Sequence, residues 1–248
     1  MDKQPTPRAR QLLAPLSEAI AKLRETFETQ AAFRPEASER EFLIATNDYV
    51  EALLLAPVVR VLQREAPAVS IRTVRAEYLF VAPNDRLQSG ELDLALGFFG
   101  EAMRPHSGLL TQRLLRDRLV CILREAHPHA ARKLTLRNFV ETPQVRILYP
   151  GDERLGSIDM ILRGRGVSRR VAITVPHFLT IPAIVAKSNL LGIVPERLAR
   201  REARACRLKI FDAPIALPDI TVMMAWHERL QFDHAHRWFR DCIAATNE

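Results

Sequence analysis

The contrast between apolar and polar positions is sharpest at residues 41–63, where a short apolar run leads directly into a helical stripe. The run begins at Phe42 with the length of one strand, and the chain turns polar at 46–48. Apolar residues then recur at about every fourth position, which is the spacing of one helix face. Asp48 and Glu51 are spaced as a capping box, so we expect the helix to begin there. A strand that leads straight into a helix is the half-unit of an open α/β sheet.

Two more strands follow the same plan. They are expected at 70–76 and 92–98, with a short helix at 84–89 between them that Gly90 should end. Successive strand–helix units of this kind predict a parallel sheet with right-handed connections.

The pattern changes after this third strand, and the chain builds a second α/β unit before it returns. Extended segments are expected at 109–115 and 118–124, and the second of them should cross into another sheet. In the second unit we expect helices at 136–140, 157–163, 176–187 and 196–203, and strands at 144–149, 170–175, 191–194 and 210–211. A strand at 219–226 leads back to the first unit, where a last helix begins at Asp233 or His234. Two connections between two lobes make a hinge, with a ligand cleft between the lobes.

Residues 6–28 predict an N-terminal helix, with Thr6 as its cap and Pro7 at its first position. A narrow apolar seam runs along it, formed by Leu12, Leu16, Ile20, Leu23 and Phe27. Such a seam is typical of helices that pair as a dimer or a coiled coil, and the alternative is a helix packed on its own domain. The polar stretch 34–38, which contains Pro35, has the composition of a linker.

The composition is that of a globular protein without a membrane span. Of the 248 residues, 48% are apolar and 26% are charged, and no apolar run approaches the roughly 20 residues that a membrane helix needs. The N-terminus lacks the apolar segment of a secretory signal. The three cysteines form no CxxC motif and their number is odd, which favours a reduced cytoplasmic protein.

The net charge of +7 invites a nucleic-acid interpretation. However, the arginines are spread along the chain, and their short runs are not interleaved with the aromatic residues of a single-strand binding surface. We therefore favour a solvated basic surface over direct contact with nucleic acid.

No set of catalytic residues emerges. Cys121 lies within an apolar strand, where a buried and inert thiol is expected rather than a nucleophile. His234 and His236 near Asp233 do not form a recognised metal-binding pattern. The dinucleotide, P-loop and GxSxG motifs are absent. The sequence thus predicts no enzyme activity, no cofactor and no metal.

Candidate ligand contacts gather where predicted strands end. Thr46 and Asn47 lie between the first strand and its helix, where unpaired helix amides also point outward, although both side chains could serve only as caps. Arg75 flanks the carboxyl end of the second strand and could reach a carboxylate. Phe98 and Phe99 end the third strand, and only one of two neighbouring strand residues can face the site; we take Phe98.

Four further candidates belong to the second unit or to the returning strand. His177 follows a strand and a proline, and could donate to a carboxylate or hydroxyl or simply cap nearby backbone. Phe178 beside it is equally compatible with core packing. Tyr149 ends a strand and could offer its hydroxyl, and Trp226 ends the returning strand, where hinge packing is the alternative.

Several stretches taken together resemble the effector-binding part of LysR-type transcriptional regulators, within the aromatic-effector and nodulation-type branch. The matching stretches are LQSGELDLALG at 87–97, RLVCILREAHP at 118–128, VPHFLTIP at 175–182, IVPERLAR at 193–200 and MMAWHERLQFDHAHRWFR at 223–240. Each is weak alone, but their order and spacing are specific. The resemblance implies an α/β, two-lobed, type 2 periplasmic-binding-protein-like fold with two crossover strands, preceded by a linker helix. We expect the linker and join at 1–38, regulatory lobe I at 39–123 and 225–248, and lobe II at 124–224.

The resemblance also implies a function and partners. A small effector, often an aromatic acid or phenolic, should bind between the lobes and control transcription, and the matching histidine of the family supports His177 as a contact. The family forms homodimers or homotetramers, partly through the helix after the first strand, so Tyr49, Leu53 and Arg60 should face a partner. DNA binding belongs to a helix-turn-helix domain that would precede the linker helix. The alternatives are a free-standing solute-binding protein or an enzyme on the same fold.

Overall fold

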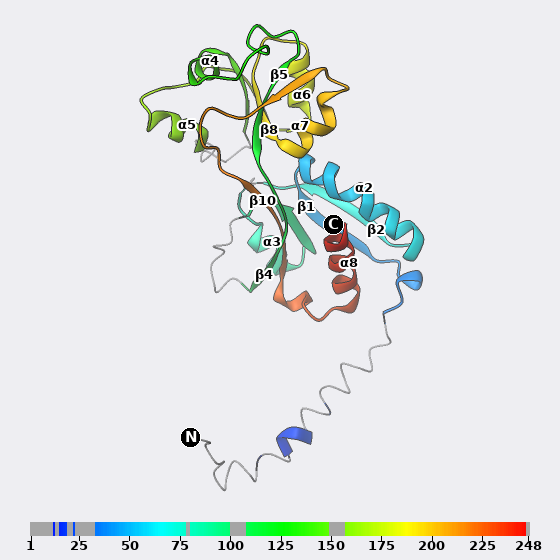
Figure 1. Ribbon diagram of the computed structural model, residues 1–248. Coiled ribbons are helices and arrows are strands. Elements are labelled where there is room, and N and C mark those ends of the chain that lie inside the picture. Colours follow the sequence, from blue (N-terminus) through cyan, green and yellow to red (C-terminus); the bar gives the residue numbers. More distant parts are fainter. Residues whose placement is uncertain are drawn as a thin grey trace, which may run out of the picture.

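The protein has two α/β lobes, one above the other in Figure 1, joined by two extended segments. The structure is a computed structural model that describes residues 12, 15–18, 22, 33–77, 80–99, 108–148 and 157–246. In chain order the elements are η1 (Pro35–Ala37), β1 (Glu41–Thr46), α2 (Asp48–Glu65), β2 (Ser70–Arg75), α3 (Asn84–Ser89), β3 (Leu94–Gly97), β4 (Leu109–Asp117), β5 (Leu119–Arg124), α4 (Leu136–Glu141), β6 (Gln144–Ile147), α5 (Ser157–Arg163), β7 (Val171–Val175), α6 (Thr180–Ala186), β8 (Gly192–Pro195), α7 (Glu196–Ala203), β9 (Leu208–Phe211), β10 (Ile220–His227), η2 (Glu228–Leu230) and α8 (His234–Ala245).

Lobe I is built on a five-stranded sheet with the order β2-β1-β3-β10-β4. β1 is parallel to β2 and β3, whereas β10 runs antiparallel to β3 and β4. Alternating residues of β1 point to opposite faces, as a strand requires. Phe42 stacks on Phe239 of α8, with ring centroids 4.1 Å apart, in the core that α2 shares. Ala45 points to the other face and packs in the cluster that contains Leu87 of α3.

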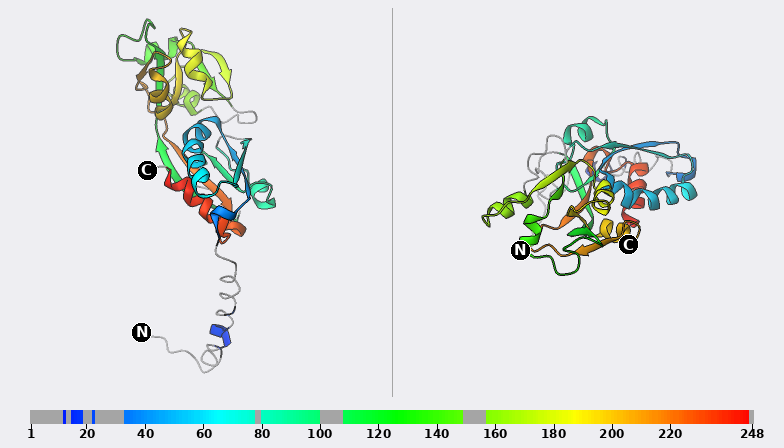
Figure 2. Two further views of the ribbon diagram at one scale, coloured as in Figure 1. Left: turned by 90° about the vertical axis from the view of Figure 1, so that its right-hand side faces the viewer. Right: turned by 90° about the horizontal axis from the view of Figure 1, so that it is seen from above.

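Lobe II is built on a three-stranded antiparallel sheet with the order β8-β5-β9, and on the parallel pair β6-β7. One bridge, between Gln144 and Leu191, links the two. The sheet is covered by α6 and α7 and by the apolar cluster around Phe139 and Leu162, which brings in α4 and α5. Figure 2 shows the two lobes in succession along the long axis of the molecule.

Both connections between the lobes are extended. β4 ends in the sheet of lobe I at Asp117, and β5 begins in the sheet of lobe II at Leu119. The chain returns between β9 and β10, and β10 pairs only with strands of lobe I. On these pairings, and because Ile215 and Leu217 pack in the lobe II cluster, we propose crossings at residues 118 and 218–219, in place of the lobe boundaries at 123/124 and 224/225 expected from the sequence.

Two local predictions need correction. The cap of α2 is Asn47, whose Oδ1 accepts a hydrogen bond from the amide of Val50 at 3.0 Å, so the predicted capping box beginning at Asp48 is wrong. The helix expected from residue 176 begins at Thr180, because Phe178 and Leu179 form a turn first. By contrast, α3 ends as predicted, since Gly90 follows it with a φ of 86° in the left-handed region.

Two residues of the predicted dimerisation seam, Leu12 and Leu16, are exposed. Ile20, Leu23 and Phe27 lie outside the described residues, so pairing through this helix stays a prediction. Among the described helices, none combines the length and the apolar character needed to span a membrane.

Candidate functional site

The structure brings four of the predicted contacts to one edge of the lobe I sheet. Thr46 pairs in register with Arg75 at the carboxyl ends of β1 and β2, and Phe98 directly follows β3, the other neighbour of β1. Thr46 is only 1% exposed, and its hydroxyl lies 3.4 Å from the carbonyl oxygen of Asn47. Asn47 is also buried, and Arg75 is exposed. This edge has the position at which open α/β sheets bind ligands.

Phe98 is the centre of an aromatic cluster that spans both lobes. Its ring centroid lies 6.0 Å from that of Tyr49, 6.1 Å from that of Phe80 and 6.0 Å from that of Phe178. Phe178 comes from lobe II, is 4% exposed and meets Tyr49 edge to face at 6.2 Å. His177 precedes it and is half-buried, with its carbonyl oxygen accepting the hydroxyl of Thr180 at 2.8 Å. The segment that leads from β7 to α6 therefore lies against the edge that carries Phe98.

Asp48 adds a polar contact between the lobes. Its Oδ2 accepts a hydrogen bond from the amide of Leu179 at 2.7 Å. Its other carboxylate oxygen, Oδ1, is buried and has no hydrogen-bond partner among the described residues. A buried acceptor without a donor is costly, so this oxygen is suited to accept a donor from a bound molecule.

The position of Trp226 argues against a role in this site. Because β10 runs antiparallel to β3, its end lies at the opposite edge of the sheet from Phe98. There the indole Nε1 donates to Gln231 at 2.9 Å, and the guanidinium of Arg240 stacks over the ring at 4.5 Å. Trp226 thus packs lobe I, and we omit it from the proposed site. Tyr149 lies outside the described residues.

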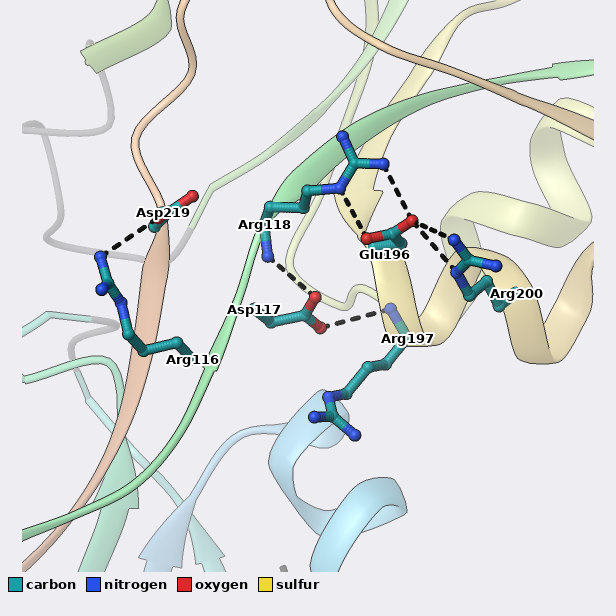
Figure 3. A pocket seen from close by; sticks show the side chains of 7 residues that line it. All are labelled: Arg116, Asp117, Arg118, Glu196, Arg197, Arg200 and Asp219. Atoms are coloured by element: carbon teal, nitrogen blue, oxygen red, sulfur yellow. Dashed lines mark hydrogen bonds and ion pairs between the residues drawn. The ribbon is translucent and has the colours of Figure 1, made fainter.

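A buried carboxylate stands at the first crossing between the lobes. Asp117 accepts hydrogen bonds from the hydroxyl of Tyr49 and from the amides of Arg118 and Arg197. An open cavity of about 600 Å³ adjoins it, lined by Arg116, Asp117, Arg118, Glu196, Arg197, Arg200 and Asp219 (Figure 3). Arg118 and Arg200 both bond to Glu196 and hold the pKa of its carboxyl down at about 2. Figure 3 shows the guanidinium of Arg197 turned away from this cluster, toward α2.

Sequence reasoning missed Tyr49, Asp48 and Asp117. The family resemblance assigned Tyr49 to a partner-facing surface, but its side chain is 2% exposed and lies inside its own chain. Asp48 had a local explanation as a cap, and Asp117 lay just beyond a predicted strand. The only available signal was that a tyrosine and two carboxylates stood next to predicted strand ends.

Two observations concern metal binding and thiol reactivity among the described residues. They contain no group of three or more His, Cys, Asp and Glu side chains placed to hold a metal ion. Burial raises the pKa of the Cys121 thiol to about 12, so it stays protonated at neutral pH.

Two α/β lobes joined by two crossings, with polar and aromatic side chains gathered where they meet, define a type 2 periplasmic-binding-protein-like domain. Residues 35–248 match the family model of the LysR substrate binding domain, and the chain belongs to this family. It is the ligand-binding regulatory domain of a LysR-type transcriptional regulator.

Named relatives agree with this family. The HTH-type transcriptional activator NagR of Ralstonia sp is 33% identical over 239 residues, which are 96% of this chain and 77% of NagR. The HTH-type transcriptional activator NahR of Pseudomonas putida is 32% identical over 240 residues, covering 97% of this chain and 78% of NahR. The crystal structure of the probable transcriptional regulator PA0477 from Pseudomonas aeruginosa superimposes with a TM-score of 0.76 at 31% identity, over 98% of this chain and 78% of that one.

Proposed function

We propose that this domain senses a small aromatic acid or phenolic effector held between the lobes, and that binding changes lobe closure and so transcription. The observation that supports the proposal is the aromatic cluster in which Phe98 of lobe I meets Phe178 of lobe II. A planar ligand that stacks on both rings would favour one arrangement of the lobes over others, which is what an effector must do. We further propose that the protein acts in the cytoplasm as a sensor and not as an enzyme.

The polar groups around this cluster suit the two ends of such a ligand. Asn47 at the start of α2, Arg75 and His177 can meet a carboxylate, because each offers donors near a helix N-terminus or strand end. Asp48 Oδ1 can accept a hydrogen bond from a phenolic hydroxyl, since no described residue bonds to it. Thr46, next to Asn47, offers a hydroxyl that can turn toward either end of the ligand.

Titration calorimetry with a small panel tests the ligand class. Benzoate, phenol, a hydroxybenzoate and cyclohexanecarboxylate separate the contributions of ring, carboxylate and hydroxyl. We expect the aromatic compounds to bind and raise the melting temperature, and the hydroxybenzoate to bind tightest because it satisfies both ends. If no compound binds and the melting temperature is constant, the aromatic-effector proposal is wrong.

A histidine substitution tests the contribution of lobe II. His177→Ala should weaken binding of the preferred compound by on the order of 1–3 kcal/mol if the imidazole bonds to it. His234→Ala is the matched control, because His234 is exposed at the start of α8 in lobe I. Equal affinity of both variants and the unsubstituted protein would leave His177 as a purely structural residue.

We propose a homodimer or homotetramer assembled partly through the linker helix, with DNA contacted by a helix-turn-helix domain. The exposed Leu12 and Leu16 support this assembly, because exposed apolar side chains on one helix face are typical of a surface that a partner covers. Light scattering at high concentration tests it. A strict monomer would remove the role of the linker helix and favour a free-standing binding protein.

A further inference from the structure

One side chain connects the proposed effector site with the hinge. The ring of Tyr49 lies within 6.2 Å, centroid to centroid, of both Phe98 and Phe178. Its hydroxyl donates a hydrogen bond to Asp117, at the first crossing. Burial and the neighbouring carboxylate raise the pKa of Tyr49 far above its usual range. The phenol therefore stays neutral and keeps its proton for this bond.

Asp117 in turn is bonded to both lobes. Its Oδ2 accepts from Tyr49 in α2 of lobe I and, at 3.3 Å, from the amide of Arg197 in the first turn of α7 in lobe II. Its Oδ1 accepts from the amide of Arg118 at 2.8 Å (Figure 3). The residue is 8% exposed, so its carboxylate depends mainly on these three donors. A rotation of the lobes about this crossing must change at least one of these bonds.

We propose that Tyr49 is a positioning residue that couples effector binding to lobe closure, with its hydroxyl and Asp117 forming a latch at the hinge. The proposal rests on the proposed function, because it takes an effector at Phe98 and Phe178 as its input. A ligand ring that displaces or orders these two rings moves the Tyr49 ring packed against them. The hydroxyl transmits this movement to Asp117, and Asp117 transmits it to the start of α7.

One other contact between the lobes lies apart from the aromatic cluster. Arg201 of α7 donates to the carbonyl oxygen of Ala52 at 3.4 Å, and both residues lie outside the aromatic cluster. This bond is on the same helix as Arg197 and joins the same two lobes. Arg201→Gln is therefore a matched control for the latch.

Hydrogen exchange read by mass spectrometry on the full chain tests the latch. In the unsubstituted protein, the preferred compound of the calorimetric panel should slow exchange in the peptide that covers the start of α7. Tyr49→Phe keeps the ring and removes the hydroxyl. Without ligand, hydrogen exchange at the start of α7 should be roughly ten-fold faster in this variant than in the unsubstituted protein, because Asp117 loses the hydroxyl of Tyr49 as a donor. The variant should still bind the ligand, but the ligand should no longer slow hydrogen exchange at the start of α7.

Arg201→Gln should keep the ligand-induced slowing. The latch is refuted if Tyr49→Phe shows the same slowing as the unsubstituted protein. Faster exchange throughout the chain would indicate general destabilisation, and Asp117→Asn then provides a second reading. If that variant also exchanges uniformly faster, the latch is refuted. If no panel compound binds the unsubstituted protein, the proposed function fails, while the ligand-free comparison at α7 still decides the latch.

Discussion

The two edges of the lobe I sheet are built from different chemistry. We call the end of the sheet where β1 and β3 begin the amino edge, and the end where they finish the carboxyl edge. At the amino edge, Arg40 makes two hydrogen bonds to Asp233, at 2.9 and 2.8 Å, and one to Asp93 at 3.0 Å. Asp93 also accepts the amide of Leu43, and its carbonyl oxygen lies 3.0 Å from Nε2 of the buried His236. Every charged group in this network has two or more partners. The network ties β1, β3 and α8 together where the chain enters the lobe.

The carboxyl edge combines local hydrogen bonds, aromatic contacts and one hydrogen bond that Asp48 accepts from lobe II. Thr46 and Asn47 bond within their own turn, and Asp48 keeps one buried oxygen without a described partner. The aromatic contacts of Phe98 with Tyr49, Phe80 and Phe178 lie at the same edge. The same sheet therefore carries an ionic network at one edge and an aromatic cluster at the other.

The largest expected effect is at the amino edge. Asp93→Ala removes one of the two carboxylate partners of Arg40 and the acceptor for the amide of Leu43, and should lower the free energy of unfolding by about 3 kcal/mol. Urea denaturation measures this change. Asp219→Ala is the control, because its ion pair with Arg116 is exposed and its loss should cost less than about 1 kcal/mol. Similar costs for both variants would contradict the contrast between the edges.

A pH dependence should follow from His236 in the same network. Burial lowers its pKa from 6.5 to about 4, with the Arg240 guanidinium beside it as a further cause. His236 therefore becomes protonated near pH 6.5 in the unfolded chain, but only near pH 4 in the folded protein. The stability that the neutral form of His236 contributes is fully present above pH 6.5. It is lost as the pH falls toward 4, by roughly 2–3 kcal/mol in the free energy of unfolding.

Urea denaturation at a series of pH values measures this loss, and His236→Gln should reduce it. His127→Gln is a suitable comparison, because burial also lowers the pKa of His127, but outside this network. If the two variants flatten the profile equally, His236 has no special role at the amino edge.

The sequence predicted the elements of this sheet well and the relations between them less well. The strand from Phe42, the helix after it and the end of α3 at Gly90 depend on local patterns, and the structure has all three. The placement of Trp226 depended on the direction of β10 relative to β3, which periodicity does not contain. Trp226 was therefore grouped with Phe98 as a ligand contact, although the two residues lie at opposite edges of the sheet.

The grouping of the candidate contacts follows in part from the sequence, for a related reason. Thr46, Arg75 and Phe98 follow from the rule that parallel strands end at one edge, and the structure groups them. Tyr49 and Asp117 are 68 residues apart in sequence, and they meet only because α2 passes the crossing between the lobes. No local pattern encodes such a contact.

The smallest expected change in stability separates capping from ligand contact at the carboxyl edge. Asn47→Ser keeps a side-chain oxygen that can accept from the amide of Val50, since serine caps helices about as well as asparagine. Asn47→Ala removes the cap and should cost about 1 kcal/mol more in unfolding free energy. Both variants remove the amide donor. If Asn47 contacts the effector, both should lose affinity for the preferred compound equally, measured by calorimetry, although only the alanine variant loses the cap. If serine restores affinity together with stability, Asn47 acts on the site only by starting the helix.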